Sequence, residues 1–245
     1  MHRLLVPPER LLQDSPLLPK EAANHLRVLR PKCGEEIELF DGRGNWRRYL
    51  VDGDARNFAL SASAPVESAP RPQWSLTLFA CVTKGSRWDW TIEKATELGA
   101  TRIVPVISER TIVRIGVDER SAKRERWMRI AEDAARQSDA KWLPDVCAPV
   151  AFEESLAMVR ETACFVGALT NPPPQPLLQA LMDSQQSRSL SIYVGPEGDF
   201  TPEELAELVE IATPVSFGST VLRAETAAIF GLSVLKANLD VQSAF

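Results

Sequence analysis

Two glycine-containing loops each follow a short apolar run of the chain. Gly-Pro-Glu-Gly at 195–198 comes after the apolar segment 191–194, and the loop at 218–223 comes after 215–217. In an open parallel α/β sheet, ligands bind beyond the carboxyl ends of the strands, and glycine lets the backbone approach a ligand closely. The two loops therefore predict one small-molecule pocket, although a pair of ordinary tight turns is an alternative interpretation of the same residues.

The sequence has few of the residues and motifs that metal sites, His-dependent triads and the familiar nucleotide-binding sites require. The only histidines are His2 and His25, which argues against a His-dependent triad or a multi-His metal centre. No Gly-x-Gly-x-x-Gly loop follows the first strand expected in the α/β part, and there is no Walker A motif, which disfavours the familiar modes of NAD and ATP binding. Four cysteines form no Cys-x-x-Cys pair and are expected to be buried small side chains: Cys33, Cys81, Cys147 and Cys164. We therefore expect no metal.

The charge distribution is uneven along the chain. The formal net charge is −5, which by itself argues against a crude nucleic-acid-binding surface. Residues 84–129 nevertheless carry 11 Lys and Arg against 7 Asp and Glu, whereas residues 151–245 carry 4 against 12. An anionic polymer would dock on the first half of the chain, but a solvated helix face explains the same charges equally well.

The first seventy residues have the pattern of a small β domain. Segments 37–40 and 46–51 flank a glycine-rich turn and predict a hairpin, and 57–62 predicts a third strand. A short helix is expected over 21–30, ending before Pro31. A proline-rich stretch at 64–72 is typical of a linker, so we place a first domain at 1–70 and a second at 71–245.

The second part alternates between strands and helices, which predicts an α/β fold with a mostly parallel sheet. Helices are expected at 88–98 and 121–137, and Thr201 with Glu204 forms a capping box at the start of another. Strands are expected where continuous apolar runs occur, at 76–82, 103–107, 164–167, 191–194 and 215–217. No run of eighteen apolar residues occurs and the first apolar stretch is too short for a signal peptide, so we expect no membrane span and a cytoplasmic location.

Several short motifs, in this order, closely resemble the RsmE family of 16S ribosomal RNA uracil-N3 methyltransferases, which belongs to the SPOUT superfamily. The resemblance covers nearly the whole chain, and although each motif alone is weak, their order is specific. The motifs are His-Leu-Arg-Val-Leu-Arg at 25–30, Leu-Phe-Asp-Gly at 39–42, Lys-Gly-Ser-Arg at 84–87 with Glu-Lys-Ala-Thr-Glu-Leu-Gly at 93–99, Gly-Pro-Glu-Gly at 195–198, and Leu-Arg-Ala-Glu-Thr-Ala at 222–227.

The resemblance implies a fold and a cofactor that the composition does not show. The first domain would be a PUA-like β-barrel that helps to hold RNA. The second would be a SPOUT-type domain with a deep trefoil knot, an exception to the rule that chains are not threaded. The family works as a homodimer with S-adenosylmethionine bound in the knot loops, and its target lies in small-subunit ribosomal RNA.

The resemblance also implies roles for particular residues. Arg223 would stabilise a developing uracil anion, and Glu225 would orient the base or take its proton, although a charge–dipole contact at a helix N-terminus also explains Glu225. Residues expected to line the cofactor pocket are Leu169, Thr170, Gly195, Glu197, Gly198, Gly218, Val221 and Leu222. Of these, Glu197 is expected to accept hydrogen bonds from loop amides.

Four cations are the candidates for RNA phosphate binding, because arginine and lysine supply the charge and the donors that phosphate requires. They are Arg27, Arg30, Lys84 and Arg87. Trp88 and Trp90 follow closely and offer rings for base stacking, but core packing is the commoner use of tryptophan.

The sequence departs from the family at a few positions. After Gln137-Ser138 the family continues with glycine and arginine, whereas this chain has Asp139 and Ala140, with Lys141 as a partial substitute. Thr220 stands where a basic residue is common, and Asp199 stands where a second glycine is usual. These changes weaken the local attraction for RNA and put the RNA target in more doubt than the cofactor.

Two other functions stay open from the sequence. The departures at Asp139, Ala140 and Thr220 fit a related SPOUT-type enzyme that methylates another base or a ribose, on tRNA or another ribosomal RNA target. The sequence pI near 5.3 fits a non-catalytic RNA-binding or ribosome-assembly protein that kept the fold. Because both glycine loops expected to bind the cofactor are intact, the non-catalytic function ranks third of the three.

Overall fold

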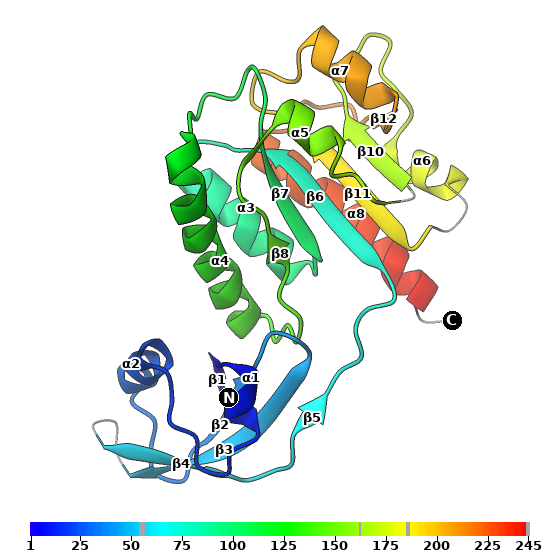
Figure 1. Cartoon of the computed structure of the whole chain (residues 1–245). Coiled ribbons are helices and arrows are strands. Elements are labelled where there is room, and N and C mark those ends of the chain that lie inside the picture. The colour runs from blue at the N-terminus through cyan, green and yellow to red at the C-terminus, as the bar shows by residue number, and fades with distance from the viewer. Residues whose placement is uncertain (54–56, 162, 185–186, 244–245) are drawn as a thin grey trace. The chain divides into compact units, whose positions relative to one another are not determined.

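The chain forms two compact units, each described here by itself. The structure is a computed structural model and describes residues 1–53, 57–161, 163–184 and 187–243. The first unit comprises Met1–Arg71 together with Glu132–Leu143, and the second comprises Pro72–Ala131 and Pro144–Phe245 (Figure 1). The division at residue 70 expected from the sequence assigned 132–143 to the second domain, whereas this segment packs with the first unit.

The first unit is built on a five-stranded sheet. β1 pairs in parallel with β2, and β2, β3 and β4 follow as antiparallel neighbours, with β5 also paired to β3. The predicted hairpin is confirmed as β2 and β3, and Gly42 and Gly44 in its turn both have the positive φ that favours glycine. The elements are β1 (His2–Leu5), α1 (Pro8–Leu11), α2 (Lys20–Leu29), β2 (Glu36–Phe40), β3 (Asn45–Gly53), β4 (Phe58–Ala62) and β5 (Glu67–Ser68).

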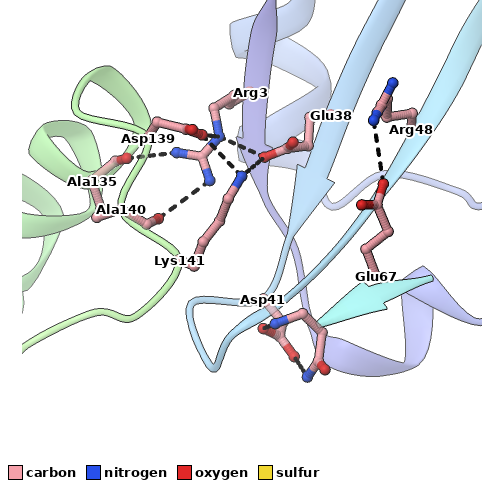
Figure 2. A network of polar contacts seen from close by, with 10 residues as sticks. Arg3, Glu38, Asp41, Arg48, Glu67, Ala135, Asp139, Ala140 and Lys141 are labelled. Atoms are coloured by element: carbon pink, nitrogen blue, oxygen red, sulfur yellow. Dashed lines mark hydrogen bonds and ion pairs between the residues drawn. The ribbon is translucent and has the colours of Figure 1, made fainter. Parts of the chain in front are cut away.

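A buried polar network holds the segment 132–143 within this unit (Figure 2). The Arg3 side chain donates from Nε to Glu38 at 2.7 Å and from Nη1 to the Ala135 carbonyl at 2.7 Å. It also donates to the Ala140 carbonyl at 3.2 Å and lies 3.1 Å from Asp139. The side chains of Arg3 and Glu38 are only 6% and 4% exposed, so each depends on its partners for the interactions that water would otherwise supply.

Asp139, at the departure from the family, contacts the nearby Lys141. Asp139 has φ +59°, a conformation that favours glycine, and its carboxylate accepts from Lys141 Nζ at 2.9 Å. Lys141 also donates to Glu38 at 3.0 Å and lies over the Trp46 ring at 4.4 Å. Lys141 is therefore engaged inside the first unit, and the expectation that it partly substitutes for an RNA-binding arginine finds no support in these contacts.

The second unit contains the larger sheet, in the strand order β12-β10-β11-β6-β7-β8, with β9 also paired to β7. Every pairing in it is parallel, which confirms the fold class expected from the alternation of strands and helices. The elements are β6 (Ser75–Cys81), α3 (Ser86–Glu97), β7 (Arg102–Ile107), a 3-10 turn (Val117–Glu119), α4 (Arg120–Gln137), β8 (Asp145–Val146), β9 (Val150–Ala151), α5 (Phe152–Leu156), β10 (Ala163–Gly167), α6 (Leu177–Asp183), β11 (Ser189–Val194), α7 (Pro202–Val209), β12 (Thr213–Val215) and α8 (Ala224–Ser243). The last residues of α4, from Glu132 on, belong to the first unit.

Both faces of this sheet are covered, which explains the continuous apolar runs of its strands. α8 packs along β6 and β11 and contacts α3, as Figure 1 shows. On this face Trp88 of α3 packs edge-on against Trp127 of α4, with ring centroids 5.6 Å apart. On the other face Phe79 stacks on Tyr193 at 4.4 Å. Trp88 thus belongs to the core, whereas Trp90 is 41% exposed.

The predicted capping box at the start of α7 is confirmed. The Thr201 hydroxyl accepts from the Glu204 amide at 3.1 Å, and Glu204 Oε2 accepts from the Thr201 amide at 2.9 Å. The other oxygen of Glu204 accepts from the Glu109 amide at 2.8 Å, so this cap also ties α7 to the loop after β7. Among the described residues, no helix has the length and hydropathy to cross a membrane.

The cysteines differ in exposure, and this leads to a testable expectation. Burial raises the pKa of Cys81 to about 12 and that of Cys164 to about 11, and it also raises the pKa of the half-buried Cys147. Cys33 is exposed, so the expectation that every cysteine is buried is wrong at this position. At pH 8 we expect a disulfide reagent to modify Cys33 quickly and the other thiols slowly, because only the thiolate reacts.

Counting the cysteine thiols that have reacted over time, for the native protein and for Cys33→Ser, measures this difference in reaction rate. In denaturant all four cysteines should react. A fast phase that persists in Cys33→Ser would contradict the exposure pattern.

Candidate cofactor and catalytic site

Three loops of the second unit converge on one cavity. They follow β10, β11 and β12, which are neighbours in the parallel sheet and therefore end at the same edge. The cavity has a volume of about 280 Å³, just below the roughly 300–1,000 Å³ usual for small-ligand pockets. It is lined by Gly167, Ala168, Leu169, Val194, Gly195, Pro196, Glu197, Asp199, Val215, Ser216, Phe217, Gly218, Thr220, Val221, Leu222, Arg223, Ala224 and Ala227.

Most of the residues predicted from the sequence lie in this wall, but two do not. Leu169, Gly195, Glu197, Gly218, Val221 and Leu222 line the cavity. The Thr170 hydroxyl instead donates to the Pro172 carbonyl at 2.9 Å, outside the lining. The Gly198 carbonyl accepts from Arg110 Nη1 at 2.9 Å, and Gly198 is also absent from the lining.

Asp199 is a wall residue that the sequence did not single out as a ligand contact. It has φ +58°, which explains why a glycine suits this position. Its carboxylate accepts from the amides of Leu169 at 3.4 Å and Phe200 at 2.9 Å, so it links the loop after β10 to the loop after β11. Its place directly after the Gly-Pro-Glu-Gly motif, where a second glycine is usual in the family, was a signal in the sequence that could have identified it.

Glu197 has a different partner from the one expected. No hydrogen bond from a loop amide to Glu197 occurs in the described part of the chain, and its Oε1 instead lies 3.0 Å from Arg87 Nη1. The side chains of Arg87 and Glu197 are 40% and 28% exposed, so the pair lies at the surface. This contact connects the start of α3, where an RNA-binding candidate lies, to the wall of the cavity.

Arg223 lies at the junction between the cavity and a second hollow, and Glu225 lines the second hollow. Arg223 is exposed and lines both. The second hollow is an open groove of about 570 Å³, lined by Ser86, Arg87, Trp90, Arg223, Glu225 and Thr226. Glu225 lies in the first turn of α8, where the helix dipole favours a carboxylate, yet its Oε2 is buried and has no hydrogen-bond partner among the residues that the structure describes.

The other RNA-binding candidates lie on exposed surface. Lys84, just before α3, is exposed. In the first unit, Arg27 donates to Asn24 at 2.9 Å and lies over the Phe58 ring at 5.7 Å, while Arg30 ends α2 with φ +51°. No group of three or more His, Cys, Asp or Glu suited to a metal ion occurs within the described ranges.

Two family models match the chain. An RNA methyltransferase domain matches residues 69–236, and an RNA methyltransferase PUA domain matches residues 18–57. The first match alone spans more than half of the chain, and the second agrees with the PUA-like first unit expected from the sequence.

Individual relatives agree with these models. Ribosomal RNA small subunit methyltransferase E of Synechocystis is 33% identical over 98% of this chain and 78% of its own length. A crystal structure of ribosomal RNA small subunit methyltransferase E from Neisseria gonorrhoeae, bound to S-adenosyl methionine, is 28% identical with a TM-score of 0.83. A methyltransferase of Legionella pneumophila, in complex with the same cofactor, is 28% identical with a TM-score of 0.82. Both structural alignments cover 97% of each chain. This chain belongs to the RNA methyltransferase family that includes ribosomal RNA small subunit methyltransferase E.

Proposed function

We propose that this protein uses S-adenosylmethionine to methylate N3 of a uridine in 16S ribosomal RNA of the small subunit. The observation that carries the proposal is the convergence of three loops, from the carboxyl ends of β10, β11 and β12, on one cavity bordered by Arg223. We further propose that it acts in the cytoplasm as a homodimer, because the family it resembles works in this form.

The walls of the cavity fit S-adenosylmethionine. Leu169, Val221 and Leu222 supply apolar contacts for a flat ring system, and Gly195 and Gly218 present backbone to the ligand. The carboxylates of Glu197 and Asp199 favour a cationic ligand such as a sulfonium. When bound, the cofactor supplies a methyl group that is already activated on sulfur.

The residues of the chain then have to align the base with the cofactor and assist the loss of the proton from its N3. Proximity and orientation of this kind contribute about 7–11 kcal/mol in favourable systems. N3 of uracil carries a proton that leaves as the N3–methyl bond forms. Arg223 stabilises the negative charge that develops on the ring, and Glu225 orients the base or accepts the proton.

Exposed cations supply the RNA affinity. We assign this role to Lys84 and Arg87 at the start of α3, and to Arg27 and Arg30 at the end of α2. Each forms charge-assisted contacts with phosphate oxygens, which position the RNA without reading its sequence.

The direct test is incubation of the protein with unmodified small subunits and S-adenosylmethionine, followed by digestion of the RNA and mass spectrometry of the nucleosides. We expect 3-methyluridine, formed at one position. Its absence from every RNA species would contradict the proposal, and methylation of a different base or of a ribose would assign the protein to another SPOUT-type activity.

A glycine substitution tests the cofactor cavity separately from the chemistry. A Cβ at Gly195 would lie 3.0 Å from Asp199 Oδ1 and 3.3 Å from the Phe200 ring, so valine must displace the loop. Such overpacking costs about 1–3 kcal/mol, and we expect Gly195→Val to bind S-adenosylhomocysteine about tenfold or more weakly.

Calorimetric titration measures this affinity, and Gly198→Ala is the matched control. Its Cβ would make an ordinary 3.5 Å contact with Arg110, away from the cavity lining, so an affinity within about twofold of the original is expected. Equal effects of the two substitutions would argue against the geometry of this wall.

A further inference from the structure

Both histidines of the chain line one cavity of the first unit. His2 lies on β1 and His25 on α2, and Arg136 from the last turn of α4 lines the same cavity. The histidine cavity, defined by these three side chains, has a volume of about 410 Å³, and none of the described residues lines both it and the cofactor cavity. All of its lining residues belong to the first unit. Three nitrogen-bearing side chains from distant parts of the sequence therefore converge on one hollow.

The carboxylates of the histidine cavity are already neutralised. Glu38 and Asp139 are the acidic residues in its described lining. Glu38 accepts from Arg3 at 2.7 Å and from Lys141 at 3.0 Å (Figure 2). Asp139 lies 3.1 Å from Arg3 and accepts from Lys141 at 2.9 Å. Two positive charges thus balance two negative charges, and the remaining charge of the cavity comes from Arg136 and the two histidines.

These three side chains have weak partners or none. No hydrogen bond or ion pair of His25 occurs in the described part of the chain. Arg136 pairs with Asp133, whose side chain is 65% exposed and lies outside the cavity lining. His2 Nε2 lies 3.4 Å from Glu35, and their side chains are 36% and 35% exposed. Exposed pairs of this kind are weak and are screened by water, so an anion that enters the cavity can accept from the same donors.

The electrostatic surroundings of His25 disfavour its charged form. Burial, followed by the positive charge of Arg136 and by His2, lowers the pKa of His25. An anion in the cavity acts in the opposite direction, because it stabilises the imidazolium. Anion binding is therefore strongest below the pKa of His25 in the free protein, and the gain is lost as the pH rises through its pKa in the complex. The charged and ionisable residues that line the cavity around His25 are His2 and Arg3 of β1, Glu38 of β2, and Arg136 and Asp139 of the segment 132–143.

The lining of the cavity fits a phosphate group better than a base. The described lining residues include no aromatic ring, and the apolar ones are Met1 and Leu29, so a base would find nothing to stack on. Guanidinium and imidazolium groups supply the charge and the N–H donors that phosphate oxygens require. Arg27 and Arg30, to which we assigned RNA phosphates, lie on α2 and at its end. The helix that brings His25 to the cavity therefore also carries phosphate contacts of the same chemistry.

We propose that the histidine cavity binds a phosphate group of the RNA backbone, held by the side chains of His2, His25 and Arg136. The guanidinium and the two imidazolium rings donate to its oxygens, and Arg136 exchanges Asp133 for the phosphate. The site holds the RNA and does not touch the reacting base. The RNA as the source of the phosphate rests on the proposed function, whereas the affinity for phosphate does not depend on which reaction the second unit catalyses.

Nuclear magnetic resonance measures this site directly, because the chain has only two histidines. The imidazole Cε1–H signals of the full-length protein are followed against pH in sodium phosphate and in sodium chloride of the same ionic strength, and His25→Asn identifies the signal of His25. We expect saturating phosphate to raise the pKa of His25 by about half a unit or more, which corresponds to about threefold tighter binding to the protonated form. Equal pKa values in the two salts would overturn the site.

Arg136→Gln tests the arginine of the site. It should weaken the binding of inorganic phosphate about tenfold, as measured from the shift of the His25 signal, because a charge-assisted contact is lost. Arg43→Gln is the matched control, since Arg43 is an exposed arginine of the same unit outside the cavity lining, and it should leave phosphate binding unchanged. Thermal unfolding checks that both variants are folded. If Arg136→Gln is not, His2→Gln takes its place and should weaken binding about threefold. An affinity equal to that of the control would place the phosphate elsewhere and overturn the assignment.

The RNA backbone is tested as the source of the phosphate by fluorescence anisotropy with an unmodified 16S ribosomal RNA transcript. Affinities are measured at about pH 6 and about pH 8 in the same salt, because RNA binding depends steeply on salt. The original protein should lose affinity as the pH rises, and His25→Asn should lose about threefold less, since its titrating imidazole is gone.

The outcomes separate this proposal from the proposed function. If inorganic phosphate binds but the transcript shows the same pH dependence with His25→Asn as with the original protein, the RNA backbone is not the source and the proposal is overturned in that part. If both tests succeed while no uridine is methylated, the proposed function fails and the phosphate site stands. If uridine is methylated but phosphate moves neither histidine signal, the phosphate site alone is refuted.

Discussion

Replacing Arg223 with alanine should lower the turnover number by about 100- to 1,000-fold, the usual cost of removing one preorganised donor from a site of developing charge. Arg223 is exposed and lies where the cofactor cavity meets the groove, so its guanidinium can reach a base beside the cofactor. The uracil ring gains negative charge only as N3 loses its proton. An interaction made only at that stage lowers the turnover number and kcat/KM equally.

Single-turnover methylation of small subunits measures the chemical step, and calorimetry with S-adenosylhomocysteine measures the cofactor affinity. The affinity should stay within about threefold, because the wall of the cavity is mainly backbone and apolar side chains. Arg160→Ala removes another exposed arginine, which lies outside both hollows, and should change neither quantity. A collapse of cofactor affinity in Arg223→Ala would make Arg223 a structural part of the cavity instead of a catalytic residue.

Replacing Glu38 with alanine should reduce the free energy of unfolding by about 3–5 kcal/mol, the usual cost of removing one partner from a buried ion pair. Glu38 is 4% exposed and accepts from both Arg3 and Lys141, at 2.7 and 3.0 Å. Its loss leaves the buried Arg3 guanidinium with Asp139 and two carbonyl groups, so the effect should lie near the lower end of this range.

Urea unfolding of the full-length protein measures this loss, with Glu36→Ala as the matched control on the same strand. The Glu36 side chain is 41% exposed and lies 4.0 Å from Arg48, so its removal should cost no more than about 1 kcal/mol. Because chains with more than one compact unit often depart from two-state unfolding, the fluorescence transition and the loss of helix signal have to be followed together. Equal stability of the two variants would show that the network of Figure 2 contributes little to folding.

The sequence by itself determined the local structure and the position of the cavity. Continuous apolar runs predicted strands buried on both faces, and β6, β7, β10 and β11 occur where such runs were found, whereas β12 lies at Thr213–Val215 and shares only Val215 with the strand expected at 215–217. Thr201 and Glu204 predicted their helix start because a capping box requires only neighbours in sequence. The two glycine loops predicted a pocket because the carboxyl ends of parallel strands lie at one edge of a sheet.

Only the tertiary structure decided which distant side chains meet. Arg3 pairs with Glu38, 35 residues away, and the contacts of the segment 132–143 with Arg3 and Glu38 span more than one hundred residues. Arg87 and Glu197 are likewise far apart in sequence, and neither residue type reveals its partner. Periodicity could not separate the buried Trp88 from the exposed Trp90, because exposure depends on what other elements bring to each side of a helix. The pattern of neighbouring residues in the sequence predicts local backbone geometry. The partners of charged and aromatic side chains are determined only when distant parts of the chain pack together.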